Sequence, residues 1–237
     1  MTRDEILKKL SLKTLSSARK GADALIALDD ADAYDAALDG VVWGQYRSFQ
    51  GGTVIRKQNL NELVPLLLAH ALPKSPTARA LAASVTTLSI APHSHPGLLP
   101  VLRHFTGLET LSIYRLPLTD LTPLAAFSRL TSLTLQPDGS LPALPALPAL
   151  QTLKLSAPPT HRWDLSHITV TESLRLHGGR LERIDRLPGA STLMLRGIGG
   201  LTHIDVLPAG LKRLDLHDCP ALTALTALPG TTTLASL

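Results

Sequence analysis

Three histidines are the first residues whose spacing could support chemistry. His93 and His95 are separated by one residue, and His104 follows further along the chain. Neighbouring imidazoles can bind a metal ion, but a zinc site needs a third and a fourth ligand at fixed geometry. No Asp, Glu or Cys occurs between residues 85 and 108. The sequence therefore favours a polar loop over a metal site, and it predicts no bound metal.

The single cysteine, Cys219, directly follows Asp218 and lies two residues after His217. A thiol enzyme would need a base oriented by a third group, together with an oxyanion site. The structural alternative is a buried thiol that supports a turn. The sequence favours the structural role, and it predicts neither catalytic residues nor a cofactor. One cysteine also excludes an internal disulfide framework.

Two further motifs have a structural interpretation beside the functional one. Pro142, Pro145 and Pro148 lie in the run LPALPALPAL, which could mimic a polyproline ligand. The run also fits a segment that returns from one strand to the next, and the sequence favours that role. The glycine pairs 178–179 and 199–200 are isolated and are expected in return segments, so neither forms a phosphate-binding loop.

Composition sets the class of protein. The 237 residues are 44% hydrophobic and 18% charged, with a net charge of +4. The positive charge is spread along the chain, whereas nucleic-acid binders concentrate it on one stripe or helix, so nucleic acid is not favoured as a partner. No apolar run is long enough for a membrane helix, and no signal peptide precedes Lys20. The sequence predicts no membrane association and a cytoplasmic protein, with secretion as an effector the alternative.

The elements that must position these residues come from an internal repeat. A centre of the form Leu-x-Leu or Leu-x-Ile recurs every 19 to 23 residues. Its copies are Leu88–Ile90, Leu111–Ile113, Leu133–Leu135, Leu153–Leu155, Leu174–Leu176, Leu193–Leu195 and Leu214–Leu216, with a partial copy at Leu234. The alternation predicts short strands with leucines on one face. One such unit cannot bury its apolar face alone, but stacked units form a continuous core.

Over residues 85–237 the chain resembles the leucine-rich-repeat family. The last repeats, from Leu207-Pro208 to Leu228-Pro229, resemble the short bacterial repeat of secreted effectors. The family's asparagine after the strand is replaced here, for example by Cys219, Ile198 and Gly179. The resemblance implies an α/β solenoid of about eight parallel strands, and a protein-binding role for the concave face of its sheet.

Residues 1–84 lack the repeat and are predicted to be mainly helical. Thr2 and Glu5 form a capping-box signature, the aspartates near Asp30 indicate a helix junction, and helices are expected over 61–72 and 77–83. We interpret 1–84 as a capping domain before the repeat domain of 85–237, because solenoid ends need a cover. The alternative is a partner-docking module centred on Trp43, Tyr46 and Phe49.

Aligning the repeats predicts three columns of side chains on the solvent face of the strands. The first column is mainly Thr and Ser, as strand propensity explains. The other two become larger and more charged toward repeats four to seven, which suggests a recognition patch. The predicted partner-binding residues are Tyr114, Gln136, Lys154, Arg175, His177, Met194, Arg196, Arg213, Asp215 and His217.

These observations predict a module for protein–protein interaction that is not an enzyme. Two alternatives stay open: a bacterial effector or defence-type protein aimed at a host or phage protein, and an enzyme that uses His217, Cys219 or the His93 pair. A second contact is expected at the end of the chain. The strand around 232–236 would leave an unpaired edge, which invites self-association or partner docking.

Overall fold

The computed structural model describes residues 1–12, 14–41, 60–91, 96–139, 141–163, 169–184, 189–207 and 210–225. The chain forms two compact units, Met1–Leu108 and Glu109–Leu237. Three predicted features lie outside the described residues: the aromatic cluster at 43–49, the histidines at 93 and 95, and the terminal strand at 232–236.

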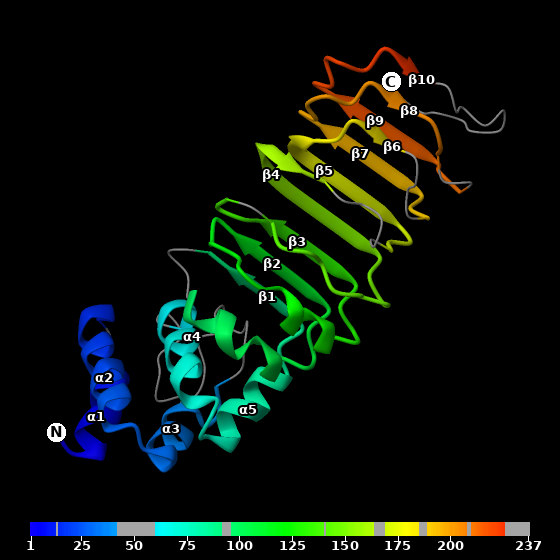
Figure 1. Cartoon of the computed structure of the whole chain (residues 1–237). Coiled ribbons are helices and arrows are strands. Elements are labelled where there is room, and N and C mark those ends of the chain that lie inside the picture. The colour runs from blue at the N-terminus through cyan, green and yellow to red at the C-terminus, as the bar shows by residue number, and fades with distance from the viewer. Residues whose placement is uncertain are drawn as a thin grey trace. The chain divides into compact units, whose positions relative to one another are not determined.

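The first unit is mainly helical (Figure 1). Its α-helices are α1 (Arg3–Leu10), α2 (Leu15–Leu28), α3 (Ala31–Leu38), α4 (Leu60–Ala71) and α5 (Pro76–Ala83). The strand β1 (Thr87–Ile90) and the 3-10 helix η2 (Pro96–His104) complete the unit. The helices that the sequence predicted are therefore present.

Side chains at the helix ends explain where these helices start. The backbone N–H of Thr2 donates to Glu5 Oε2 at 2.8 Å, and the Glu5 N–H donates to Thr2 Oγ1 at 3.3 Å. This is the predicted capping box. Asp30 Oδ1 accepts from the Ala33 N–H at 2.8 Å and begins α3, which confirms the predicted junction between α2 and α3.

The second unit is a parallel-strand solenoid. Its main sheet contains β2 (Thr110–Tyr114), β3 (Ser132–Gln136), β4 (Thr152–Arg162), β5 (Ser173–Arg180), β7 (Thr192–Arg196) and β9 (Arg213–His217), adjacent in that order (Figure 1). The first leucines of successive strands are register partners, from Leu111 beside Leu133 to Leu193 beside Leu214. The repeat spacing thus predicted both the strands and their register.

The leucine columns form the core of this unit. Leu111, Leu133, Leu153 and Leu174 are each 0% exposed. Leu216 of β9 is only half-buried. Turns with a neighbour on both sides therefore bury their leucines fully, as stacking of incomplete units requires.

The segments that return from one strand to the next carry structure that the sequence did not predict. After β2 the return contains the 3-10 helix η3 (Thr122–Ala126). Later returns contribute β6 (Arg183–Ile184), β8 (His203–Ile204) and β10 (Ala224–Leu225), which pair in parallel as a second sheet. Among the described residues, no helix is long and apolar enough to cross a membrane.

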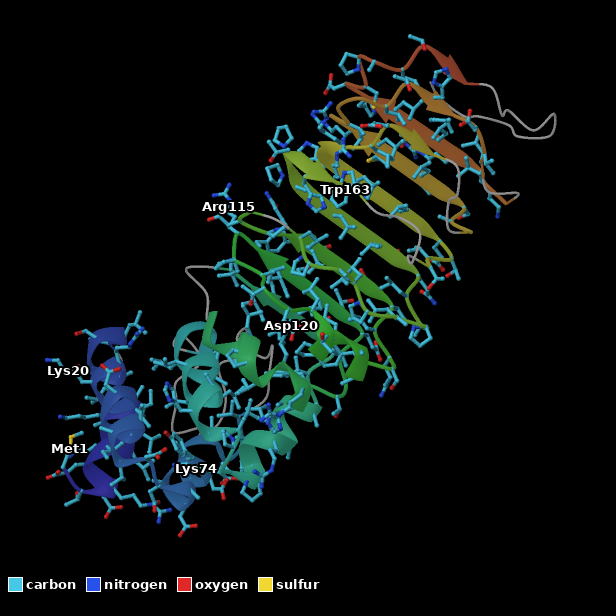
Figure 2. All side chains as sticks on the ribbon, viewed as in Figure 1. Met1, Lys20, Lys74, Arg115, Asp120 and Trp163 are labelled. Carbon is cyan, nitrogen blue, oxygen red and sulfur yellow. The ribbon has the colours of Figure 1, made fainter. Side chains whose placement is uncertain are left out.

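Left-handed residues recur where strands of the main sheet end. Arg115 follows β2 with a φ of 49° (labelled in Figure 2), Gly197 follows β7 with 63°, and Asp218 follows β9 with 53°. Gly178, inside β5, has a φ of 72°. It was expected in a return segment but lies in the strand, beside Ala157 of β4.

Candidate functional surface

The polar columns occupy one face of the main sheet, which we call the open face. Parallel in-register pairing places Tyr114 beside Gln136, and Lys154 beside Arg175. On the following strands Met194 lies beside Asp215, and Arg196 beside His217. Successive side chains of a strand point to opposite faces of the sheet. Because the leucines point into the core, the polar columns lie on the face opposite the core. The predicted columns are therefore aligned as expected.

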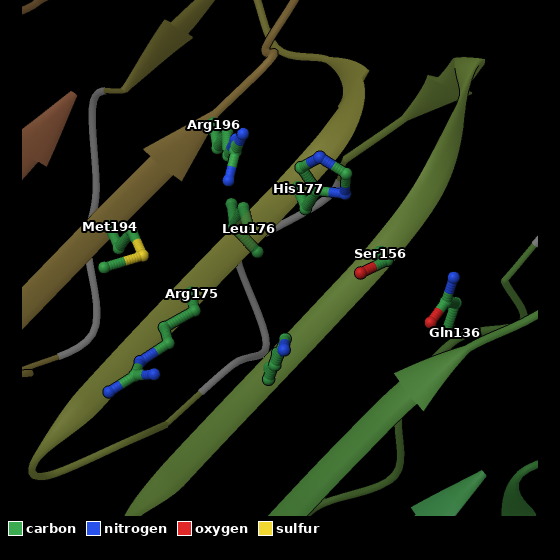
Figure 3. Close-up of a pocket in the computed structure, with 8 residues that line it drawn as sticks. Gln136, Ser156, Arg175, Leu176, His177, Met194 and Arg196 are labelled. Atoms are coloured by element: carbon green, nitrogen blue, oxygen red, sulfur yellow. The ribbon is translucent and has the colours of Figure 1, made fainter. Parts of the chain in front are cut away.

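A hollow of about 320 Å³ lies on the open face, over β3, β4, β5 and β7 (Figure 3). It is lined by Gln136, Lys154, Ser156, Arg175, Leu176, His177, Met194 and Arg196. Six of these belong to the predicted partner-binding set. The remaining four members of that set, Tyr114, Arg213, Asp215 and His217, lie on β2 and β9 and not in the hollow.

The lining of the hollow is basic. Lys154, Arg175 and Arg196 contribute cations, and no carboxylate belongs to the lining. Arg175 donates from Nε to Ser173 Oγ at 3.4 Å, within its own strand. Lys154, Arg175, His177 and Arg196 are all exposed. The surface can therefore offer several hydrogen-bond donors and positive charges to a ligand.

Arg213 and Asp215 form an ion pair beside the hollow. Arg213 Nε lies 3.1 Å from Asp215 Oδ1 and 2.9 Å from Oδ2. The alternation of the strand predicted an outward Asp215, yet Asp215 is only 5% exposed. Because its carboxylate already accepts from Arg213, Asp215 fixes that side chain and presents little surface of its own.

Arg196 and Asp218 make a looser contact. Arg196 Nε lies 4.0 Å from Asp218 Oδ2, and the two side chains are 62% and 78% exposed. An exposed pair at that distance contributes little stability. Arg196 is therefore available to a ligand, and so is the exposed His217 on the neighbouring strand.

Cys219 lies in the turn after β9 and contacts backbone carbonyls. Its Sγ lies 3.5 Å from the His217 oxygen and 3.9 Å from the Leu195 oxygen. Burial raises the pKa of the Cys219 thiol, and the negative charge of Asp218 adds to the rise. A reactive cysteine shows the opposite shift, because the thiolate is the nucleophile.

Of the three histidines considered above, only His104 belongs to the described residues. It is the last residue of η2. Burial lowers the pKa of the His104 imidazole, and the positive charges of Arg103 and Arg79 lower it further. Across the part of the chain that the structure describes, no group of three His, Cys, Asp or Glu side chains could hold a metal ion.

The proline run 141–150 has no helix or strand. Leu147 and Leu150 are buried at 5% and 3% exposure, while Pro142 and Pro145 are half-buried. The run is thus partly packed against the solenoid.

Two lining residues, Ser156 and Leu176, are not in the predicted set. Ser156 is the residue of the third column on β4, and its register partner is His177. Ser156 is small and uncharged, whereas the predicted patch was defined by large and charged side chains. Its place in the sequence could have identified it, because Ser156 is the register partner of His177 and lies two residues after Lys154 on the same strand. Leu176 belongs to a core column, so the alternation assigns it to the opposite face.

Comparisons with known proteins give no match. No protein-family model, no curated protein and no solved structure is significantly similar to this chain. The geometry of the open face is therefore the basis for assigning a function.

Proposed function

We propose that this chain is a protein-interaction module of the leucine-rich-repeat type, and that its open face binds a partner protein. The observation that carries the proposal is the hollow on that face. It is lined by six predicted residues that diverge in type from strand to strand, while the leucines beneath them repeat. These side chains give the hollow positive charge, uncharged polar groups and an apolar contact, which a partner protein can recognise.

The energetics of interfaces support the same role. Arginine, methionine and aromatic residues are enriched where proteins bind one another, and a few of them carry most of the binding energy. The open face presents Arg175, Arg196 and Met194 around one hollow, and Tyr114 lies on β2. These side chains are the anchors of the proposed interface.

Charge reversal tests this proposal. Arg175→Glu combined with Arg196→Glu should abolish capture of the partner from an extract of the native organism. The circular dichroism spectrum should not change and the melting temperature should not fall, because exposed substitutions cost under about 0.5 kcal/mol. The matched control combines Lys20→Glu on α2 with Arg103→Glu on η2, both exposed in the first unit. Wild-type capture by the open-face double variant would refute the proposal.

The contacts of Cys219 support a role in the turn and not in catalysis. At neutral pH a thiol with a raised pKa is protonated. Cys219→Ser should therefore retain full partner binding, with only a small fall in melting temperature. Iodoacetamide should modify the native thiol more slowly than free cysteine at pH 7.5, as followed by mass spectrometry. Rapid modification, or loss of function in a folded Ser variant, would favour the thiol-enzyme alternative.

A further inference from the structure

Two positive side chains are direct neighbours at the centre of the open face. Lys154 on β4 and Arg175 on β5 are register partners, and both are exposed. The other two arginines of this face each lie near a carboxylate, Arg213 near Asp215 and Arg196 near Asp218. Among the described residues, no ion pair involves Lys154 or Arg175.

This arrangement carries a cost for the sheet. Like charges directly opposite each other on neighbouring strands are destabilising. No carboxylate in the lining of the hollow offsets the repulsion between Lys154 and Arg175. A bound anion would offset that repulsion through an attractive contact with each cation, and charge-assisted hydrogen bonds are stronger than neutral ones.

The length of the hollow determines how many residues of an extended peptide it can hold. It extends over four adjacent strands, β3, β4, β5 and β7, which at a spacing of about 4.8 Å span roughly 14 Å. An extended peptide rises about 3.3 Å per residue, so roughly four residues cross the hollow. Met194 adds an apolar contact, and Gln136 and Ser156 add uncharged polar groups.

We infer that the hollow binds an acidic, extended segment of the partner protein, with one carboxylate held between Lys154 and Arg175. The inference rests on the proposed function and specifies the chemistry of the partner. A second acidic residue, further along the segment, would reach Arg196. A polypeptide is favoured over a nucleic acid because single-stranded nucleic acids are bound by stacking on aromatic rings, and the lining contains no Phe, Tyr or Trp.

The experiment uses the full chain and short peptides labelled with the same dye. One peptide alternates Glu with Leu and Ser, a second has Gln in place of Glu, and a third has Lys. Fluorescence anisotropy should show binding of the Glu peptide, weakened by added salt because exposed charges are screened. The Gln peptide should bind at least about tenfold more weakly, and the Lys peptide should not bind.

Lys154→Glu is the decisive variant. It should weaken binding of the Glu peptide by about tenfold or more. It should also raise the melting temperature, because the new Glu lies opposite Arg175. Loss of binding with a gain in stability cannot come from unfolding. Lys20→Glu makes the same charge change in the first unit, and it should leave peptide binding unchanged.

The remaining outcomes overturn the inference in distinguishable ways. Equal binding of the Gln and Glu peptides, unaffected by Lys154→Glu, would refute the acidic occupant while the open face could still bind a neutral segment. Binding of a single-stranded oligonucleotide in place of any peptide, lost in Lys154→Glu, would assign the hollow to nucleic acid. No binding of any peptide would refute the inference, whereas the proposed function is tested separately by the Arg175 and Arg196 double variant.

Discussion

At the scale of single residues, the glycines of β5 allow the strands to lie close together. Gly178 has a φ of 72°, and a Cβ added to it would lie 2.2 Å from the Ala157 carbonyl oxygen of β4. Gly179 has a φ of 75° and lies against the indole of Trp163 (labelled in Figure 2). Trp163 in turn donates from Nε1 to the Gly178 oxygen at 2.9 Å. Backbone conformation and space therefore both require glycine at these two positions.

Gly178→Ala should destabilise the protein by about 2 kcal/mol or more, because the left-handed conformation and the contact with Ala157 both penalise a methyl group. Urea denaturation measures the change. Gly189→Ala is the matched control, since nothing lies within 4 Å of its added Cβ. A Gly178 variant as stable as the Gly189 variant would contradict the conformation assigned to β5.

At the scale of elements, two hydrogen bonds to Asp35 join α3 to the start of α5. Asp35 of α3 accepts from the hydroxyl of Ser75, and its Oδ1 also accepts from the Thr77 N–H at 3.1 Å. Ser75 is fully buried and caps α5 by accepting from the Ala78 N–H at 2.9 Å. The hydrogen bond from Ser75 lowers the pKa of the Asp35 carboxyl, and the bonds from Thr77 add to the effect.

Removing the Asp35 carboxylate should make stability less dependent on pH. A carboxyl whose pKa is lowered by folding stabilises the protein above its unfolded pKa of about 3.9, and this contribution is lost as pH falls through the folded pKa. Asp35→Asn should therefore cost about 1 kcal/mol at pH 7. The difference from wild type should shrink below pH 4, as followed by thermal melting.

Asp32→Asn provides the control, because Asp32 is exposed on the same helix. It should change stability only slightly at any pH. If it matched Asp35→Asn at pH 7, the effect would come from the charge of the helix and not from the contact with α5.

The elements also show which features a sequence can predict. The helix starts at Thr2 and Asp30 were predictable because their capping partners are three residues away. The main strands were predictable because buried leucines alternate with polar residues. The two-residue strands β6, β8 and β10 were missed, since two residues are too short for any periodicity. The extension of β4 to Arg162 was missed because Pro158 and Pro159 are typical of loops.

At the scale of the whole second unit, stability depends on stacking between neighbouring turns. Leu174 is 0% exposed and is flanked in register by Leu153 and Leu193. Leu216, on β9, the last of the described strands of the main sheet, is half-buried. The repeat thus places a leucine both at a fully buried position, Leu174, and at a half-buried one, Leu216.

Leu174→Ala should lower the free energy of unfolding by about 2–5 kcal/mol, the range for a buried leucine that leaves a cavity. Leu216→Ala should cost less than half as much as Leu174→Ala, because solvent already reaches its side chain. Urea titration measures the two changes in free energy of unfolding. Both variants carry Trp43→Phe, so that the fluorescence comes from Trp163 alone. Equal costs would show that Leu216 on β9 is as tightly packed as Leu174 on β5.

The open face was predictable only in part at this scale. The repeat predicted the columns, so the pairing of Lys154 with Arg175 could be deduced from the sequence. The hollow depends on how side chains of four strands fill the space above the sheet. The burial of Asp215 depends on the guanidinium of Arg213 two residues away. Such details arise from side-chain conformation, which spacing alone does not encode.

The in-register stacking of leucines makes each repeat an exchangeable unit of the gene. Loss of residues 133–152 would join Ser132 directly to Leu153. The fused strand would keep the pattern of alternating leucines, and Leu111 would then face Leu153 where it now faces Leu133. On the open face Ser156 would replace Gln136 as the register partner of Tyr114. Unequal recombination between repeats could therefore alter the composition of the surface around Lys154 in one step, while the scaffold beneath it is preserved.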